Sequence, residues 1–210
     1  MHIYAFGSIC RGEIGPSSDV DLLAVVEGID DRFDPNVYSI YSYQRVREIW
    51  AEGNPFAWHL ATESKLLFST DGSDLLRSLG SPDRYRSCRR DCDKFYQLFL
   101  EARMSLMQNN TTRIFDLSMV FLGIRNFATC FSLGCLQKPD FSRHSAVRLG
   151  TSSLPIGAEP YSILERARIL CTRGLGPPIT DCEADLAAEE FPVIEEWMTA
   201  LLTEVPANEP

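Results

Sequence analysis

Residues 7–21 bring two kinds of chemically useful side chain close together in the sequence. Gly7 and Ser8 are followed by ten residues and then by the run Asp19-Val20-Asp21. A small Gly-Ser turn exposes backbone N–H groups and a hydroxyl, which can bind phosphate oxygens. Two carboxylates separated by one residue on a strand point to the same face, because strand side chains alternate with a period of two. Paired oxygen ligands beside a phosphate-binding turn suit a Mg²⁺ ion that carries a nucleotide.

Short apolar segments flank this motif on both sides. Residues 3–6 lead into it, and residues 19–26 hold the two aspartates and continue as an apolar run. Alternation in the second segment puts the aspartates on the face of Leu23 and Val25. Both faces of the segment are apolar away from the acids, so we expect this strand to be buried on both faces except where the acids lie. Polar groups at the end of such a strand usually mark a site. We therefore expect a strand, a turn and a second strand that presents the carboxylates.

The first 80 residues are expected to complete a small mixed sheet with helices. β-forming residues predict two further strands, and helical spacing predicts a helix. These segments are 37–42 and 65–69 for the strands and 43–51 for the helix. The apolar segment 56–61 fits either kind of element.

From about residue 87 the pattern becomes helical. Long helices are predicted at 114–133 and 162–173, and Thr180 with Glu183 forms a capping-box sequence that predicts the start of another helix. The expected fold class is therefore α+β. We expect an N-terminal domain at 1–80 and a C-terminal helical bundle at 81–210.

The Gly-Ser pair, its ten-residue spacer and the Asp-x-Asp sequence resemble the signature of nucleotidyltransferases of the DNA polymerase β superfamily. The resemblance is closest to the minimal and aminoglycoside-type members. It is sharp over residues 2–27, fair over 36–69 and loose over the helical remainder, which resembles the bundle shared with HEPN domains. The resemblance implies that residues 1–80 form a nucleotidyltransferase core.

This family likeness implies an enzyme that transfers a nucleoside monophosphate with the help of Mg²⁺. The expected donor is ATP, or another nucleoside triphosphate, and the group transferred from ATP is AMP. Asp19 and Asp21 would be the catalytic residues and the metal ligands.

Four residues are expected to bind the nucleotide. Gly7 and Ser8 would hold its terminal phosphates through backbone N–H groups and the hydroxyl. Arg11 lies one helical turn beyond Ser8, and it would either neutralise phosphate charge or remain solvated. Ser18 precedes the acids and would orient Asp19 through a hydrogen bond.

One part of the family pattern is missing. The family usually has a third carboxylate on the next core strand, where this chain has Tyr38 or Ser39. Three interpretations follow: two carboxylates suffice for MgATP; Glu63 or Asp116 acts as the base; or nucleotide is bound without turnover. With two carboxylates, metal binding is expected to be weak.

Charge is distributed unevenly along the chain. Residues 174–210 hold nine of the 29 acids and no Lys or Arg, so the first 173 residues have 20 acids and 20 bases. The acidic end is either a solvated helix face or a surface for a basic partner. Acidic helices offer little electrostatic attraction to the end of a nucleic acid. The expected acceptor is therefore a hydroxyl of a small molecule or a partner protein. The alternative is a regulatory subunit that binds nucleotide and acts through these helices.

The cysteines and the apolar segments indicate the compartment. Seven scattered cysteines show no zinc-binding spacing, so we expect reduced thiols in a cytoplasmic protein. The sequence contains no run of about 18 apolar residues, so no membrane span is expected. The N-terminus has no basic segment or cleavage site, so no signal peptide is expected.

Overall fold

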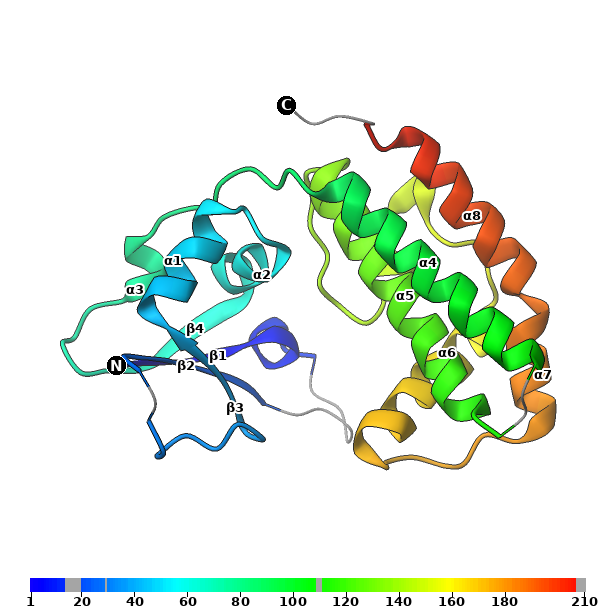
Figure 1. Cartoon of the computed structure of the whole chain (residues 1–210), viewed down its shortest axis with the longest axis horizontal. Helices are drawn as coiled ribbons and strands as arrows, with labels where there is room; N and C mark the ends of the chain where they lie inside the picture. The colour runs from blue at the N-terminus through cyan, green and yellow to red at the C-terminus, as the bar shows by residue number, and fades with distance from the viewer. Residues whose placement is uncertain (14–19, 29, 109–110, 207–210) are drawn as a thin grey trace. The chain divides into compact units, whose positions relative to one another are not determined.

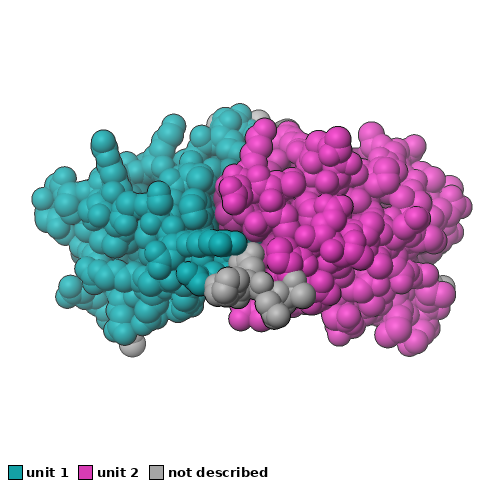
Figure 2. Space-filling model, turned by 90° about the horizontal axis from the view of Figure 1, so that it is seen from above, with its two compact units in different colours: residues 1–86 teal, residues 87–210 magenta. Residues whose placement is uncertain are grey.

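The chain divides into two compact units, shown in separate colours in Figure 2. The computed structural model describes residues 1–13, 20–28, 30–108 and 111–206. Unit 1 comprises residues 1–86 and contains a mixed sheet with helices, and the described part of unit 2, residues 87–210, is helical. The α+β fold class is confirmed.

The division lies between residues 86 and 87, a little beyond the predicted boundary at 80/81. Two hydrogen bonds tie the intervening segment to unit 1. The backbone N–H of Asp83 donates to the carbonyl oxygen of Trp50 at 2.9 Å, and Trp58 Nε1 donates to the carbonyl oxygen of Asp83 at 3.1 Å. These long-range contacts could not be inferred from the local pattern.

In the part of unit 1 that the structure describes, four strands form one sheet (Figure 1). They are β1 (His2–Phe6), β2 (Asp21–Val26), β3 (Tyr38–Ser42) and β4 (Ser64–Ser69), in the order β3-β2-β1-β4. β1 is antiparallel to both of its neighbours, and β2 is parallel to β3. β1 is therefore an inner strand with hydrogen-bonded partners on both sides.

Alternate side chains of the strands pack into two separate hydrophobic clusters. Helices α1 (Tyr43–Ala51), α2 (Pro55–Glu63) and α3 (Leu75–Ser78) contribute to the larger cluster, together with strand residues that include Tyr4, Phe6, Leu23 and Val25. Ala24, Val26 and Phe33 form the smaller cluster. The predicted alternation of β2 is therefore confirmed within its described part.

The helices of unit 1 begin at side-chain caps. Ser42 Oγ accepts a hydrogen bond from the backbone N–H of Arg45 at 3.0 Å, and α1 has the predicted bounds. Asn54 Oδ1 accepts one from the N–H of Phe56 at 2.9 Å, with Pro55 as the first helical residue. This cap, which satisfies one of the exposed first N–H groups, explains why the ambiguous segment 56–61 is helical.

Unit 2 contains five α-helices in the part that the structure describes. They are α4 (Cys88–Gln108), α5 (Arg113–Gly134), α6 (Ala158–Arg173), α7 (Asp181–Glu189) and α8 (Phe191–Glu204), with short 3₁₀ turns at Ser145–Val147 and Gly150–Ser152. α5 packs against α4, α6 and α8. By length and composition alone α5 could cross a membrane, but 67% of its apolar window is buried inside the protein. Its role as the core helix of unit 2 accounts for this composition.

Arginines of other helices neutralise part of the acidic C-terminal segment. Arg113 Nη1 lies 2.8 Å from Asp181 Oδ1, and its other terminal nitrogen pairs with Asp185. Similar pairs join Arg166 with Glu183 and Arg103 with Glu195. The predicted capping box of Thr180 and Glu183 is present at the start of α7. Several of the acids are therefore paired with arginines of the other helices of unit 2.

Candidate functional site

The Gly-Ser pair forms a tight turn directly after the inner strand β1. Residues Gly7–Arg11 make the 3₁₀ turn η1, which ends at Gly12 in the left-handed conformation. Gly7 has a φ of +76°, a region that residues with a β-carbon rarely adopt. Ser8 is half-buried, and its carbonyl oxygen accepts the N–H of Glu13 at 3.0 Å. The predicted turn is therefore present at the predicted residues.

The carboxylate of Asp21 lies against this turn. Asp21 is the first residue of β2, and it pairs with Phe6, the last residue of β1. A β-carbon placed on Gly7 would lie 2.7 Å from Asp21 Oδ2, well inside van der Waals contact. The chain thus brings together one predicted phosphate-binding residue and one predicted metal ligand, 14 positions apart in the sequence.

The other half of the predicted metal-binding pair is Asp19, which follows Ser18 in the sequence. Asp19 and Ser18 lie outside the described residues, so their predicted roles stay predictions. The described β2 begins at Asp21, where the predicted strand began at residue 19, and Val20 beside it is 50% exposed. The β1–β2 ladder stops at Phe6 because the chain then enters the Gly7 turn.

The register of β3 shows which of its residues shares a sheet face with Asp21. β2 pairs in parallel with β3, with Leu22 beside Tyr38 and Leu23 beside Ser39. Since side chains alternate along β2, Asp21 and Leu23 share one face, and Ser39 lies on that face too. Tyr38 lies on the opposite face, where its ring packs edge-on against Phe33 at 5.0 Å between centroids. Of these two β3 residues, Ser39 is therefore the one on the face where a third carboxylate would be expected.

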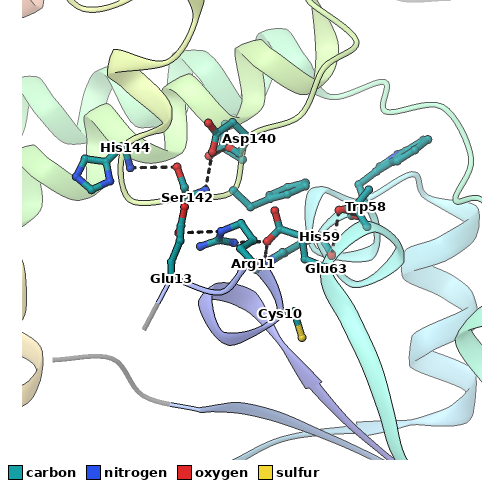
Figure 3. A network of polar contacts seen from close by, with 12 residues as sticks. Cys10, Arg11, Glu13, Trp58, His59, Glu63, Asp140, Ser142 and His144 are labelled. Carbon is teal, nitrogen blue, oxygen red and sulfur yellow. Dashed lines mark hydrogen bonds and ion pairs between the residues drawn. The ribbon is translucent and has the colours of Figure 1, made fainter. Parts of the chain in front are cut away.

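Arg11 is the centre of a polar network beside the turn (Figure 3). Arg11 Nε donates to Glu13 Oε2 at 2.9 Å, and Arg11 Nη1 pairs with Glu63 Oε2. Burial opposes the charge of Arg11, but hydrogen bonds and the charges of both glutamates outweigh it, so the pKa of Arg11 is raised. The guanidinium already has two carboxylate partners, and its predicted binding of phosphate stays a prediction.

The same network includes a histidine that the sequence did not single out as functional. His59 Nε2 lies 2.9 Å from Glu63 Oε2, one helical turn away on α2. Both side chains are largely buried, with 14% and 15% of their surfaces exposed. The i,i+4 spacing of the two residues was the available sequence signal.

Glu63 reaches the turn because α2 runs directly into β4. Glu63 is the last residue of α2, and the next residue, Ser64, pairs with Phe6. Asp116, the other candidate base, lies in α5 of unit 2. Its buried carboxylate accepts a hydrogen bond from Thr112 Oγ1 at 2.8 Å within the first turn of that helix. Within unit 1, the structure thus associates Glu63 with the Gly7 turn.

The described residues include one of the two predicted metal ligands, Asp21. Within the described ranges, no group of three or more His, Cys, Asp or Glu side chains is arranged to hold a metal ion. Asp21 nevertheless fits a Mg²⁺ ligand, since its carboxylate is a hard oxygen donor in contact with a glycine turn. A second carboxylate from Asp19 is needed to complete the predicted pair.

Comparison with known proteins agrees with this geometry. Residues 2–78 match the family model of the nucleotidyltransferase domain. No curated protein matches the chain. The matched range includes all four strands of the sheet, the Gly7 turn and α1–α3. It does not include unit 2, so the likeness of that unit to HEPN domains stays a prediction. Residues 2–78 are therefore a nucleotidyltransferase domain, consistent with the DNA polymerase β superfamily.

Proposed function

We propose that the protein transfers a nucleoside monophosphate from a nucleoside triphosphate, with Mg²⁺, to a hydroxyl group. The donor we propose is ATP, so that AMP is transferred. The observation that carries the proposal is the contact between Gly7 and the Asp21 carboxylate. The contact places an oxygen ligand beside a turn that can bind phosphate. Phosphoryl transfer needs both of these groups close together.

Asp19 and Asp21 would hold the Mg²⁺ ion. When bound, the ion would neutralise charge on the triphosphate. Gly7 and Ser8 would position the terminal phosphates through backbone N–H groups and the Ser8 hydroxyl. Ser18 would orient Asp19. The protein would thus contribute mainly position and electrostatic stabilisation, which are large terms in reactions at phosphorus.

Arg11 would exchange partners when the nucleotide binds. In the structure its guanidinium contacts Glu13 and Glu63, and phosphate oxygens would replace at least one of these carboxylates. Glu63 would then be available to accept the proton of the acceptor hydroxyl. The nearby His59 would hold the Glu63 carboxylate in place. This assignment favours Glu63 over Asp116, because the Glu63 carboxylate contacts Arg11, whereas the buried Asp116 carboxylate accepts a hydrogen bond from the Thr112 hydroxyl.

The acceptor we propose is a small hydroxylated molecule or a hydroxyl of a partner protein. A nucleic-acid end fits less well, because residues 174–210 carry nine acids and no Lys or Arg. The second candidate is a regulatory subunit that binds nucleotide without turnover. It is favoured by the lack of an acidic residue in β3 and by the compensated charge of Arg11.

One assay separates these two functions. The protein is incubated with Mg²⁺, each α-labelled nucleoside triphosphate in turn, and a panel of hydroxylated small molecules and candidate partner proteins. Transfer of label by the wild type, and its loss in Asp21→Asn, support the enzyme. The matched control is Asp31→Asn, an exposed acid in the connector between β2 and β3. Saturable binding of nucleotide with no label transferred would favour the regulatory subunit, and no binding at all would contradict both.

A further inference from the structure

Three cysteines of unit 2 converge in space although their positions in the sequence are separate. Cys88 Sγ lies 3.9 Å from Cys135 Sγ and 4.0 Å from Cys92 Sγ. We call Cys88, Cys92 and Cys135 the thiol cluster. Cys88 is its centre, because it is within reach of both other sulfurs.

Two packed helices bring the cluster together. Cys88 is the first residue of α4, and Cys135 is the residue that follows the last turn of α5. The two helices pack extensively against each other, which brings the start of one beside the end of the other. The contact joins residues 47 positions apart, so the spacing of the cysteines in the sequence gave no indication of it.

The members of the cluster differ in burial and in their position along the helices. Cys88 and Cys92 are buried, whereas Cys135 is half-buried. Cys88 and Cys135 both lie at helix ends, which can move more readily than the interior of a helix. The dipole of the 21-residue α4 also stabilises negative charge that develops on the sulfur of Cys88. Cys92 lies inside α4, one turn further along.

Metal binding does not account for the cluster. Among the residues that the structure describes, no three His, Cys, Asp or Glu side chains are arranged to hold a metal ion. The cluster consists of one close sulfur pair across two helices and a second one within α4. This arrangement fits bond formation between two sulfurs better than it fits coordination of a metal ion.

We propose that Cys88 and Cys135 form a site of reversible oxidation that closes to a disulfide when a hydroperoxide is present. The Cys135 thiolate attacks the peroxide O–O bond, which yields a sulfenic acid and hydroxide. The Cys88 thiolate then attacks the Cys135 sulfur, forms the S–S bond and displaces hydroxide. In total, two thiols and one hydrogen peroxide give one disulfide and two waters, so that sulfur is oxidised and the peroxide reduced.

The geometry favours Cys135 over Cys92 as the partner of Cys88. The sulfurs must approach from 3.9 Å to about 2.05 Å, a shift that the two helix ends can supply. A bond between Cys88 and Cys92 would have to form between side chains that project in parallel from one helix face, and neither of them is open to the oxidant. Cys10 lies outside the thiol cluster, in unit 1, where its thiol donates to the carbonyl oxygen of Ala5 at 3.4 Å.

The disulfide would fix the start of α4 to the end of α5. Cys88 is the second residue of unit 2, so the bond would lie beside the segment that connects the two units. A cross-link between residues this far apart in sequence restricts the unfolded chain and stabilises the folded state. Oxidation is therefore expected to raise the melting temperature of unit 2.

The proposal can be tested by mapping disulfides in a variant that lacks the two exposed thiols, Cys171→Ser with Cys182→Ser. The reduced protein receives a stoichiometric amount of hydrogen peroxide, is blocked with an alkylating reagent and is digested without reductant. We expect one cross-linked peptide pair containing Cys88 and Cys135, loss of two of the five remaining thiols, and reversal by dithiothreitol. The same pair is expected in the wild type.

Matched variants separate this result from random oxidation. Cys135→Ser should abolish the cross-link, whereas Cys10→Ser, which removes another half-buried thiol, should leave it unchanged. Circular dichroism of each variant checks that it is folded. A Cys88–Cys92 disulfide, a sulfinic acid on Cys135 without a cross-link, or retention of all five thiols in the folded protein would each overturn the proposal.

Discussion

Gly7 and Asp21 are so close that no side chain fits between them: a β-carbon on Gly7 would lie 2.7 Å from Asp21 Oδ2. The contact joins the end of β1 to the start of β2, at the last residue pair of their ladder. Because the carboxylate occupies this space, the identity of residue 7 determines both the shape of the turn and the position of Asp21.

Gly7→Ala is therefore expected to damage the site more than a similar change nearby. Gly12 also has a φ of +76°, but a β-carbon there would meet nothing within 4 Å. Gly12→Ala should lower the free energy of unfolding by about 1–2 kcal/mol from backbone strain alone. Gly7→Ala should cost more and should also abolish nucleotide binding. Urea unfolding and titration with MgATP compare the two, and equal effects on both measurements would contradict the contact.

Replacing both aspartates should remove metal-dependent nucleotide binding and leave the protein folded. Two adjacent carboxylates repel each other when no cation is bound, so Asp19→Asn with Asp21→Asn should have a neutral or slightly positive effect on stability. Calorimetric titration with Mg²⁺ and a non-hydrolysable ATP analogue measures the binding. Unfolding of the double variant, or affinity equal to that of the wild type, would show that the assigned role is wrong.

A carboxylate added to β3 should strengthen metal binding at position 39 but not at position 38. The register places Ser39 on the face of Asp21 and Tyr38 on the other face. Ser39→Asp should raise Mg²⁺ affinity, whereas Tyr38→Asp should lower stability by about 1–3 kcal/mol through loss of the Phe33 contact and burial of a charge. Titration with Mg²⁺ is the measurement. Unchanged affinity in Ser39→Asp would show that this strand does not border the metal.

The two carboxylate partners of Arg11 should have separable roles. Glu63→Gln and Glu13→Gln each weaken the resting pairs of Arg11, so each should tighten ATP binding about fivefold, equivalent to about 1 kcal/mol. If Glu63 is the base, only Glu63→Gln should also reduce the rate of transfer, by about 10²–10⁴-fold. Binding and turnover are measured separately on both variants. Equal transfer rates in the two would exclude Glu63 as the base.

Local sequence patterns were sufficient for most of the nucleotidyltransferase domain. Alternation and β-forming residues placed the four strands within one or two residues of their observed bounds, and helical spacing gave the bounds of α1. The segment 56–61 was ambiguous because it is apolar throughout. Its helical state depends on the cap at Asn54 and on packing under the sheet.

The remaining features depend on contacts between distant segments. Whether Tyr38 or Ser39 faces Asp21 depends on the β2–β3 register, which no local pattern determines. Arg11 was considered as a phosphate ligand or a solvated residue, yet its partner Glu63 lies 52 positions further along the chain. The thiol cluster was not expected either, because its closest sulfur pair joins two helices.

The position of β1 between β2 and β4 also determines how far apart two acids of the candidate site lie. Phe6 at its end pairs with Asp21 on one side and with Ser64, next to Glu63, on the other. With a strand spacing of about 4.8 Å, the backbones that carry Asp21, the predicted metal ligand, and Glu63, the partner of Arg11, are about 10 Å apart. Interstrand hydrogen bonds, which do not depend on side chains, maintain this separation. A slip of one residue in the β1–β2 ladder would turn Asp21 to the other face of the sheet, away from the turn. The backbone pairing of the sheet therefore determines which side chains can act together at its edge.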